Sequence, residues 1–99
     1  MKGVRFNPLA EDEFFEAIRF YEEQSPGLGA RFSEAVEQSV AFLRLYPKAA
    51  PRISRQIRRF VLPHRFPYYL LYQPLKSGDL YILAVGHQER HPRYWRGRT

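Results

Sequence analysis

Residues 65–73, Arg-Phe-Pro-Tyr-Tyr-Leu-Leu-Tyr-Gln, are, after the entry at Phe66-Pro67 and between the polar ends, aromatic or aliphatic on both faces of any strand that they form. They lie between two other strand-like runs, residues 56–62 and residues 80–86. A strand that is apolar on both sides is typical of the middle of a sheet, where it is covered above and below. Residues 65–73 are therefore expected to be the central strand, with any functional site on the basic residues that flank the strand and its neighbours.

A first helix is expected near the N-terminus. Residues 4–6 alternate as a short strand, and Asn7 before Pro8 is typical of a helix start, since asparagine caps a helix and proline suits its first position. Acidic residues follow at once, where they favour the positive end of the helix dipole. The apolar residues then recur at three- and four-residue steps. They are Ala10, Phe14, Ala17, Ile18 and Tyr21.

A second helix is expected from about residue 28 to residue 46. Ser25-Pro26-Gly27 ends the first helix, because the residue before proline disfavours the helical region and glycine permits a reversal. The short connection predicts that the two helices are antiparallel neighbours in a helical hairpin. The apolar face of the second helix consists of Leu28, Phe32, Ala35, Val36, Ser39, Phe42, Leu43 and Tyr46.

The second half of the chain predicts strands. After a turn or loop at residues 47–51, the strand at residues 56–62 places Arg58 on one face and Arg59 on the other. Residues 63–65 are expected to form a turn, and residues 74–79 a hairpin into residues 80–86. The order predicts an α+β fold, β-α-α-β-β-β, in which the helical hairpin covers one face of an antiparallel sheet. The other face is expected to hold the site.

Length and cysteine content limit the classes of function. A chain of 99 residues has room for one modest core, so residues 1–99 are expected to form a single domain. The absence of cysteine excludes disulfides, thiolate metal sites and a cysteine nucleophile, and it suits a cytoplasmic location. No run of about 18 apolar residues is present, so no association with a membrane is expected.

The net charge of +6 is unevenly distributed. Residues 1–51 carry six Lys/Arg and eight Asp/Glu, whereas residues 52–99 carry ten and two, a net charge of +8. A positive surface favours association with phosphates or with an acidic protein. A solvated basic surface without a function is the alternative that the charge alone leaves open.

The usual signatures of metal sites and hydrolases are absent from the sequence. His87 and His91 have the spacing of a zinc pair on a helix, but Gln88 stands where a metalloprotease needs glutamate, and the segment follows a strand. There is no Gly-rich phosphate loop and no serine in a nucleophile elbow. No metal and no cofactor are expected.

A group of basic and aromatic residues forms the candidate site. Arginines beside aromatics can hold a phosphate chain and stack its bases. A ribonuclease can work this way without a metal, since His or Tyr transfers protons and Arg stabilises the phosphorane. The simpler alternative is that Arg58 and Arg59 are solvated strand positions, while Tyr94 and Trp95 fold back to complete the core. The candidate target-binding residues are Arg58, Arg59, Arg65, His87, Arg90, Arg93, Tyr94 and Trp95, with Arg96 beside them.

Five segments in a fixed order carry a resemblance to a known family. They are Phe6-Asn7-Pro8-Leu9-Ala10, Gly27-Leu28-Gly29 before Arg31-Phe32, Arg58-Arg59-Phe60, the run at residues 66–72, and the tail from Ala84-Val85 through His87, Arg90 and Pro92 to Tyr94-Trp95. With them the chain resembles the RelE/ParE family of bacterial type II toxins, which includes plasmid stabilisation proteins. The resemblance implies a β-α-α-β-β-β fold and an acidic antitoxin as partner.

The family has two activities. RelE-like members are mRNA interferases that cut messenger RNA in the ribosomal decoding site, whereas ParE-like members inhibit DNA gyrase. The ribonuclease pattern carries over to the basic strand positions Arg58 and Arg59 and to Tyr94. Tyr69 and Gln88, however, stand where that pattern has arginines.

The resemblance therefore favours the ParE-like branch, and residues 66–68 and the Arg90, Pro92 and Trp95 tail also look more like it. A gyrase inhibitor is expected, and it is not expected to be an enzyme. The alternative is a ribosome-dependent, metal-independent endoribonuclease, in which Arg65 and Arg90 substitute from nearby for the missing arginines. Its catalytic candidates are Arg59, Arg65, His87 and Tyr94. A third possibility, from another class, is a non-toxic module that only binds the antitoxin.

Overall fold

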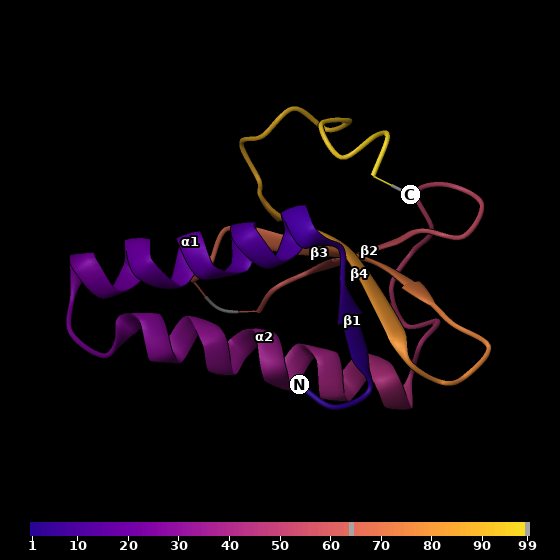
Figure 1. Ribbon diagram of the computed structural model, residues 1–99, viewed down its shortest axis with the longest axis horizontal. Coiled ribbons are helices and arrows are strands. Elements are labelled where there is room, and N and C mark those ends of the chain that lie inside the picture. Colours follow the sequence, from indigo (N-terminus) through magenta and orange to yellow (C-terminus); the bar gives the residue numbers. More distant parts are fainter. Residues whose placement is uncertain (64, 99) are drawn as a thin grey trace.

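Two helices pack on one face of a four-stranded sheet (Figure 1) in the computed structural model, which describes residues 1–63 and 65–98. The elements follow the order predicted from the sequence, so the α+β architecture is confirmed. Their bounds are β1 (Val4–Phe6), α1 (Pro8–Gln24), α2 (Leu28–Leu45), β2 (Arg58–Val61), β3 (Tyr68–Pro74) and β4 (Leu80–His87). The turn expected at residues 63–65 includes His64, which lies outside the described residues.

β3 is a central strand, as its apolar composition predicts. The strand order is β1-β4-β3-β2, and β3 pairs antiparallel with both β2 and β4. One detail of the prediction is corrected: the sheet is mixed rather than purely antiparallel, because β1 runs parallel to β4, with Val4 opposite Leu80. Asn7 alone joins β1 to α1, so the direction of β1 follows from the packing of α1 rather than from a hairpin turn.

The helical hairpin begins and turns at the residues that the sequence indicates. Asn7 Oδ1 accepts a hydrogen bond from the backbone nitrogen of Leu9 at 2.9 Å, and Pro8 occupies the first helical position. After α1 ends, Gly27 turns the chain with a φ of 87°, a left-handed conformation that glycine adopts without strain. α2 then returns beside α1, which confirms the predicted hairpin.

The end of α2 is less buried than its pattern predicts. The spacing places Phe42 and Tyr46 on the apolar face, but these side chains are 43% and 59% exposed, whereas Val40 is buried. The two rings pack against each other, and Phe42 also contacts Phe60 of β2, with ring centres 6.0 Å apart. They remain exposed because β2 is an edge strand and no further element among residues 1–63 and 65–98 covers them.

Apolar side chains are buried on both faces of the sheet. The larger cluster lies between the sheet and the helices and includes Phe32 and Leu70. The smaller cluster lies on the opposite face and includes Leu71, with Tyr94 and Trp95 packed against it. Residues 88–98, which we name the tail, therefore cover the second face, and this explains why β3 is apolar on both sides.

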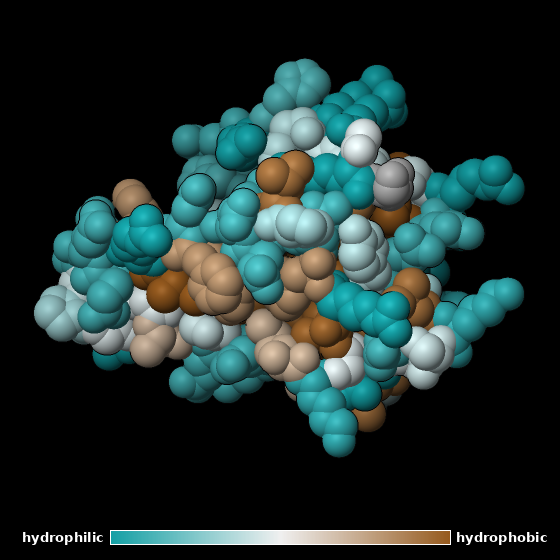
Figure 2. Space-filling model, viewed as in Figure 1, coloured by the Kyte–Doolittle hydropathy of each residue, from teal (hydrophilic) through white to brown (hydrophobic). Residues whose placement is uncertain are grey.

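Large apolar side chains remain exposed on the helical hairpin. Figure 2 shows apolar side chains gathered over α1 and α2. Phe15 and Phe20 of α1 are 53% and 52% exposed. Neither helix in residues 1–63 and 65–98 has a stretch that is long and apolar enough to cross a bilayer.

Candidate functional site

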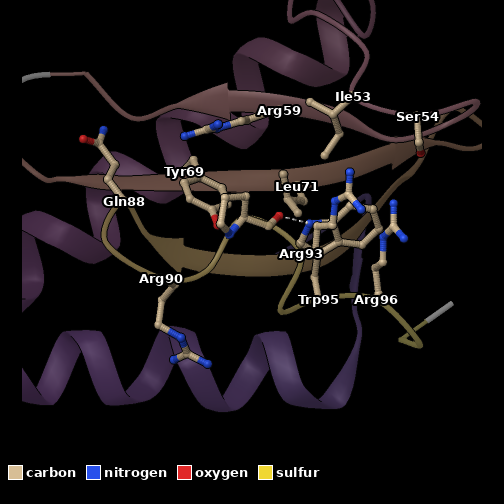
Figure 3. Close-up of a pocket in the computed structure, with 11 residues that line it drawn as sticks. Ile53, Ser54, Arg59, Tyr69, Leu71, Gln88, Arg90, Arg93, Trp95 and Arg96 are labelled. Atoms are coloured by element: carbon tan, nitrogen blue, oxygen red, sulfur yellow. Dashed lines mark hydrogen bonds between the residues drawn. The ribbon is translucent and has the colours of Figure 1, made fainter.

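A pocket of about 250 Å³ lies on the sheet face opposite the helices, between β2, β3 and the tail (Figure 3). We name it the tail pocket. In Figure 3, Gln88 lies at one end of the tail pocket, and Trp95 and Arg96 lie at the other end. Arginines and aromatic residues dominate its wall, and none of the lining residues is acidic. The pocket is lined by Ile53, Ser54, Arg59, Tyr69, Leu71, Gln88, Arg90, Pro92, Arg93, Trp95 and Arg96.

Arg59 and Tyr69 form the base of the tail pocket. Arg59 of β2 pairs with Leu71 of β3, so Tyr69 lies two residues away on the same face. The guanidinium carbon of Arg59 is 4.4 Å from the centre of the Tyr69 ring, a cation–π contact. The Nε of Arg59 is buried and finds no acceptor among the described residues.

Short turns give the tail its shape. The backbone nitrogen of Gln88 donates to Pro67 O at 2.8 Å, which brings the start of the tail beside β3. Farther along, Trp95 Nε1 donates to Pro92 O at 2.8 Å. Because the indole nitrogen is already satisfied, the Trp95 ring offers a partner only its apolar surface.

An ion pair fixes the end of the tail to α1. Arg98 donates from Nη1 to Glu13 Oε1 at 2.8 Å and from Nη2 to Glu13 Oε2 at 3.1 Å, a bidentate arrangement. These hydrogen bonds raise the pKa of Arg98. Asn7 Nδ2 donates to Arg98 O at 2.8 Å, so the residue that caps α1 also holds the tail. The tail therefore has a defined position although residues 88–98 contain no helix or strand.

The hydroxyl of Tyr94 faces the interior rather than the tail pocket. It is buried and has no hydrogen-bond partner in the described part of the chain. A Cβ at Gly86 would lie 2.6 Å from Tyr94 Oη and 2.8 Å from Tyr69 Oη, so both hydroxyls face the backbone of β4. Burial raises the pKa of Tyr94 far above its usual value, and the Glu13 carboxylate raises it further. Tyr94 is thus a packing residue that stays protonated at neutral pH.

Four arginines give the tail pocket a positive field. Arg93 and Arg96 are exposed on the tail, and Arg59 lies across the pocket on β2. Arg90 also lines the pocket, but its guanidinium lies over the Tyr94 ring, 4.3 Å from the ring centre, and points away from Arg59 (Figure 3). Within residues 1–63 and 65–98, the one ion pair is that between Glu13 and Arg98, so no carboxylate there neutralises these four charges. An uncompensated cluster of guanidinium groups attracts carboxylates and phosphates.

The structure brings together only part of the predicted site. The tail pocket contains Arg59, Arg90, Arg93 and Trp95, with Arg96 beside them. The predicted alternation of Arg58 and Arg59 is confirmed, because Arg58 lies on the helix side of β2. Arg58 therefore lies outside the tail pocket.

Arg65 and His87 also lie outside the tail pocket. Arg65 borders a separate groove beside Tyr21 of α1 and Arg31 of α2. The His87 ring packs edge-on against Tyr68, with ring centres 5.1 Å apart, on the helix side of the sheet. Side chains alternate between the two faces of a strand, so proximity in the sequence does not place these residues with Arg59.

Sequence reasoning missed the contact between Glu13 and Arg98. Glu13 follows Ala10 by three residues and precedes Ala17 by four, so it stands within the apolar stripe of α1. A carboxylate in that stripe needs a buried partner, and this spacing was the available signal. Arg98 lies 85 residues away, and no local pattern marks it as the partner.

No metal site is formed by the residues that the structure describes: no three His, Asp or Glu side chains there are grouped to hold an ion. His87 and His91 each use Nδ1 to accept a backbone hydrogen bond, from Glu89 at 3.1 Å and from Arg93 at 3.2 Å. The two imidazoles thus shape the turns of the tail.

The fold and the tail pocket define a small α+β protein with a pocket lined by positively charged side chains. A family model described as the ParE toxin of the type II toxin-antitoxin system, parDE, matches residues 4–92 of the 99. The chain belongs to this family of type II toxins, as the resemblance of its five segments predicts. No curated protein matches its sequence significantly. Arg93, Trp95, Arg96 and Arg98 lie beyond the matched residues.

Proposed function

We propose that this toxin inhibits DNA gyrase by binding it through the tail pocket and that it does not cleave RNA. One observation carries the proposal: the pocket has four arginines but no side chain placed for proton transfer. The one other ionisable residue in its lining is Tyr69, whose hydroxyl faces Gly86 and whose pKa is raised by burial. A metal-independent ribonuclease needs a general base and a general acid beside the scissile phosphate.

The residues at two positions that distinguish the branches of the family also support binding of a target rather than cleavage of RNA. Tyr69 and Gln88 line the tail pocket at the positions where the ribonuclease branch carries arginines. Neither side chain supplies a positive charge for a phosphorane. Gyrase is proposed as the target because the chain resembles the ParE-like members, which inhibit that enzyme. A toxin with this target acts in the cytoplasm.

The proposed partner is an acidic antitoxin. The net charge of +8 on residues 52–99 favours an acidic chain. The exposed Phe15 and Phe20 offer apolar contacts to an amphipathic helix laid on the helical hairpin. β2 is an edge strand, and the part of its outer edge beyond Arg59, whose backbone nitrogen already donates to Pro51 O, can accept an added strand.

Two assays on one preparation test the proposed activity. The protein should stop gyrase from supercoiling DNA and should leave messenger RNA on translating ribosomes intact. The variant Arg93→Gln/Arg96→Gln should weaken inhibition by about tenfold or more, because it removes two of the four charges in the pocket. Arg19→Gln/Arg31→Gln makes the same change of charge on exposed positions of α1 and α2 and should inhibit like the wild type.

Other outcomes select the alternatives. Cleavage of ribosome-bound message that is abolished by Tyr94→Phe or Arg59→Ala would identify the protein as an mRNA interferase. A failure to arrest growth on induction, with antitoxin binding retained, would identify it as a non-toxic binding module.

A further inference from the structure

A second basic surface lies where the loop between α2 and β2 meets the β3–β4 hairpin. Figure 1 shows these two segments at the same end of the molecule, and Figure 2 shows hydrophilic side chains projecting there. A groove of about 360 Å³, here named the end groove, lies between the segments. Its cationic residues are Lys48, Arg52, Arg55, Arg58 and Lys76.

The charges of the end groove are not neutralised from within. None of its lining residues is acidic, and all its cations except the half-buried Arg58 are exposed. None of them takes part in the ion pair found within residues 1–63 and 65–98. Concentrating five positive charges without a counter-charge is unfavourable for the isolated protein, so an anionic partner would stabilise it.

The loop that carries the cations is held in place by β2. Arg58 donates from Nη1 to Ala50 O at 2.7 Å, and the backbone nitrogen of Arg59 donates to Pro51 O at 3.0 Å. Arg52 forms an isolated antiparallel bridge with Arg58. Because the backbone of the loop is already ordered, binding a ligand requires only the exposed arginine side chains to become fixed and not the loop itself.

The lining of the groove indicates the class of ligand. It contains cations, the amides of Gln56 and Gln73, whose side chains are hydrogen-bonded at 3.0 Å, and two apolar residues, Pro74 and Leu75, but no aromatic residue. Proteins that bind single strands stack bases on aromatic side chains, whereas backbone phosphates of a duplex are held by Lys, Arg and amide groups. An acidic protein segment would also need apolar positions for its side chains, which are better offered by the helical hairpin.

We infer that the end groove binds the phosphate backbone of a nucleic-acid duplex. This activity is separate from the proposed inhibition of gyrase: it uses other residues and requires neither gyrase nor antitoxin. The contacts are electrostatic and independent of base sequence.

The inference is tested with the purified protein and fluorescent duplexes of about 20 base pairs, one of DNA and one of RNA, over a range of salt concentrations. Binding should weaken linearly on a plot of log affinity against log salt. Arg52→Gln/Arg55→Gln should make the slope less negative by about 2. It should also reduce affinity by on the order of tenfold per lost contact at 0.1 M salt. Preference for one duplex identifies the natural polymer.

A matched control separates the groove from the overall charge. Arg19→Gln/Arg31→Gln should keep the wild-type slope, because these arginines lie on the helices and not in the groove. Equal slopes for the two double variants would overturn the inference, as would tighter binding of a single strand than of either duplex. If duplex binding is equal in both variants but polyglutamate binding is lost only in Arg52→Gln/Arg55→Gln, the groove binds an acidic protein instead.

Discussion

Arg98 and Glu13, 85 residues apart in sequence, form a bidentate ion pair that holds the end of the tail against α1. Their side chains are 9% and 14% exposed, so the pair lies largely out of water. Glu13 Oε1 also accepts a hydrogen bond from the backbone nitrogen of Val85 at 3.0 Å. One carboxylate therefore joins α1, β4 and the tail.

Removing the arginine of this pair should destabilise the fold. Arg98→Gln should lower the free energy of unfolding by about 3 kcal/mol, because it leaves the Glu13 carboxylate largely buried without its cation. Urea unfolding measures the change. Arg96→Gln, two residues earlier and exposed, is the matched control and should change stability by less than about 0.5 kcal/mol. Equal unfolding midpoints for the two variants would show that the ion pair contributes nothing.

A side chain at position 86 should destabilise the protein as long as Tyr94 carries its hydroxyl. Gly86→Ala places a Cβ 2.6 Å from Tyr94 Oη, and such overpacking costs about 1–3 kcal/mol. Tyr94→Phe removes a buried hydroxyl without a partner, so by itself it should leave stability unchanged or raise it by up to about 1 kcal/mol. In a double-mutant cycle, Tyr94→Phe should recover part of the loss caused by Gly86→Ala. Strictly additive effects would argue against this contact.

Stability should fall in alkali because burial raises the pKa of several tyrosines. In the unfolded chain these phenols ionise near pH 10, whereas in the folded protein they stay protonated to higher pH. Their contribution is therefore fully present below pH 10 and is lost as the pH rises through the folded pKa values. The residues concerned are Tyr21, Tyr68, Tyr69, Tyr72 and Tyr94.

Urea unfolding between about pH 9 and about pH 11 measures this loss. Tyr94, whose pKa is raised furthest, contributes a slope that approaches about 1.4 kcal/mol per pH unit, and the other four tyrosines act in the same direction. Tyr94→Phe should reduce the slope, whereas Tyr46→Phe, at a position that is 59% exposed, should keep it. A slope that Tyr94→Phe leaves unchanged would contradict the assigned burial of the Tyr94 hydroxyl.

Antitoxin binding should depend on both charge and apolar contact. Affinity measured by titration calorimetry should fall with rising salt, because salt screens the attraction of residues 52–99 for an acidic chain. It should level off at high salt, where the apolar contacts remain. Phe20→Ala should lower that plateau, while Arg65→Gln, beside the helical hairpin, should leave the plateau unchanged and reduce only the salt dependence. An affinity independent of salt would rule out the electrostatic part of the proposal.

The positions of the elements could be predicted largely from local patterns. Asn7 and Pro8 start α1 because capping and the fixed φ of proline act within a few residues. Gly27 turns the hairpin because few other residues adopt its positive φ. The two apolar faces of β3 correctly indicated a central strand covered on both sides, although not which segment covers the second face. That segment is the tail.

The sequence by itself determined the helical hairpin, the strand order along the chain and, through the order of its motifs, the toxin family, because each rests on spacing within or between short segments. Only the tertiary structure decided that β1 runs parallel to β4, that Arg59 and not Arg58 faces the tail, and that Glu13 pairs with Arg98. Long-range packing sets these contacts, since a side chain finds its partner across the folded core regardless of distance along the chain. The same packing turned the Tyr94 hydroxyl toward the backbone of β4, so this hydroxyl does not line the tail pocket.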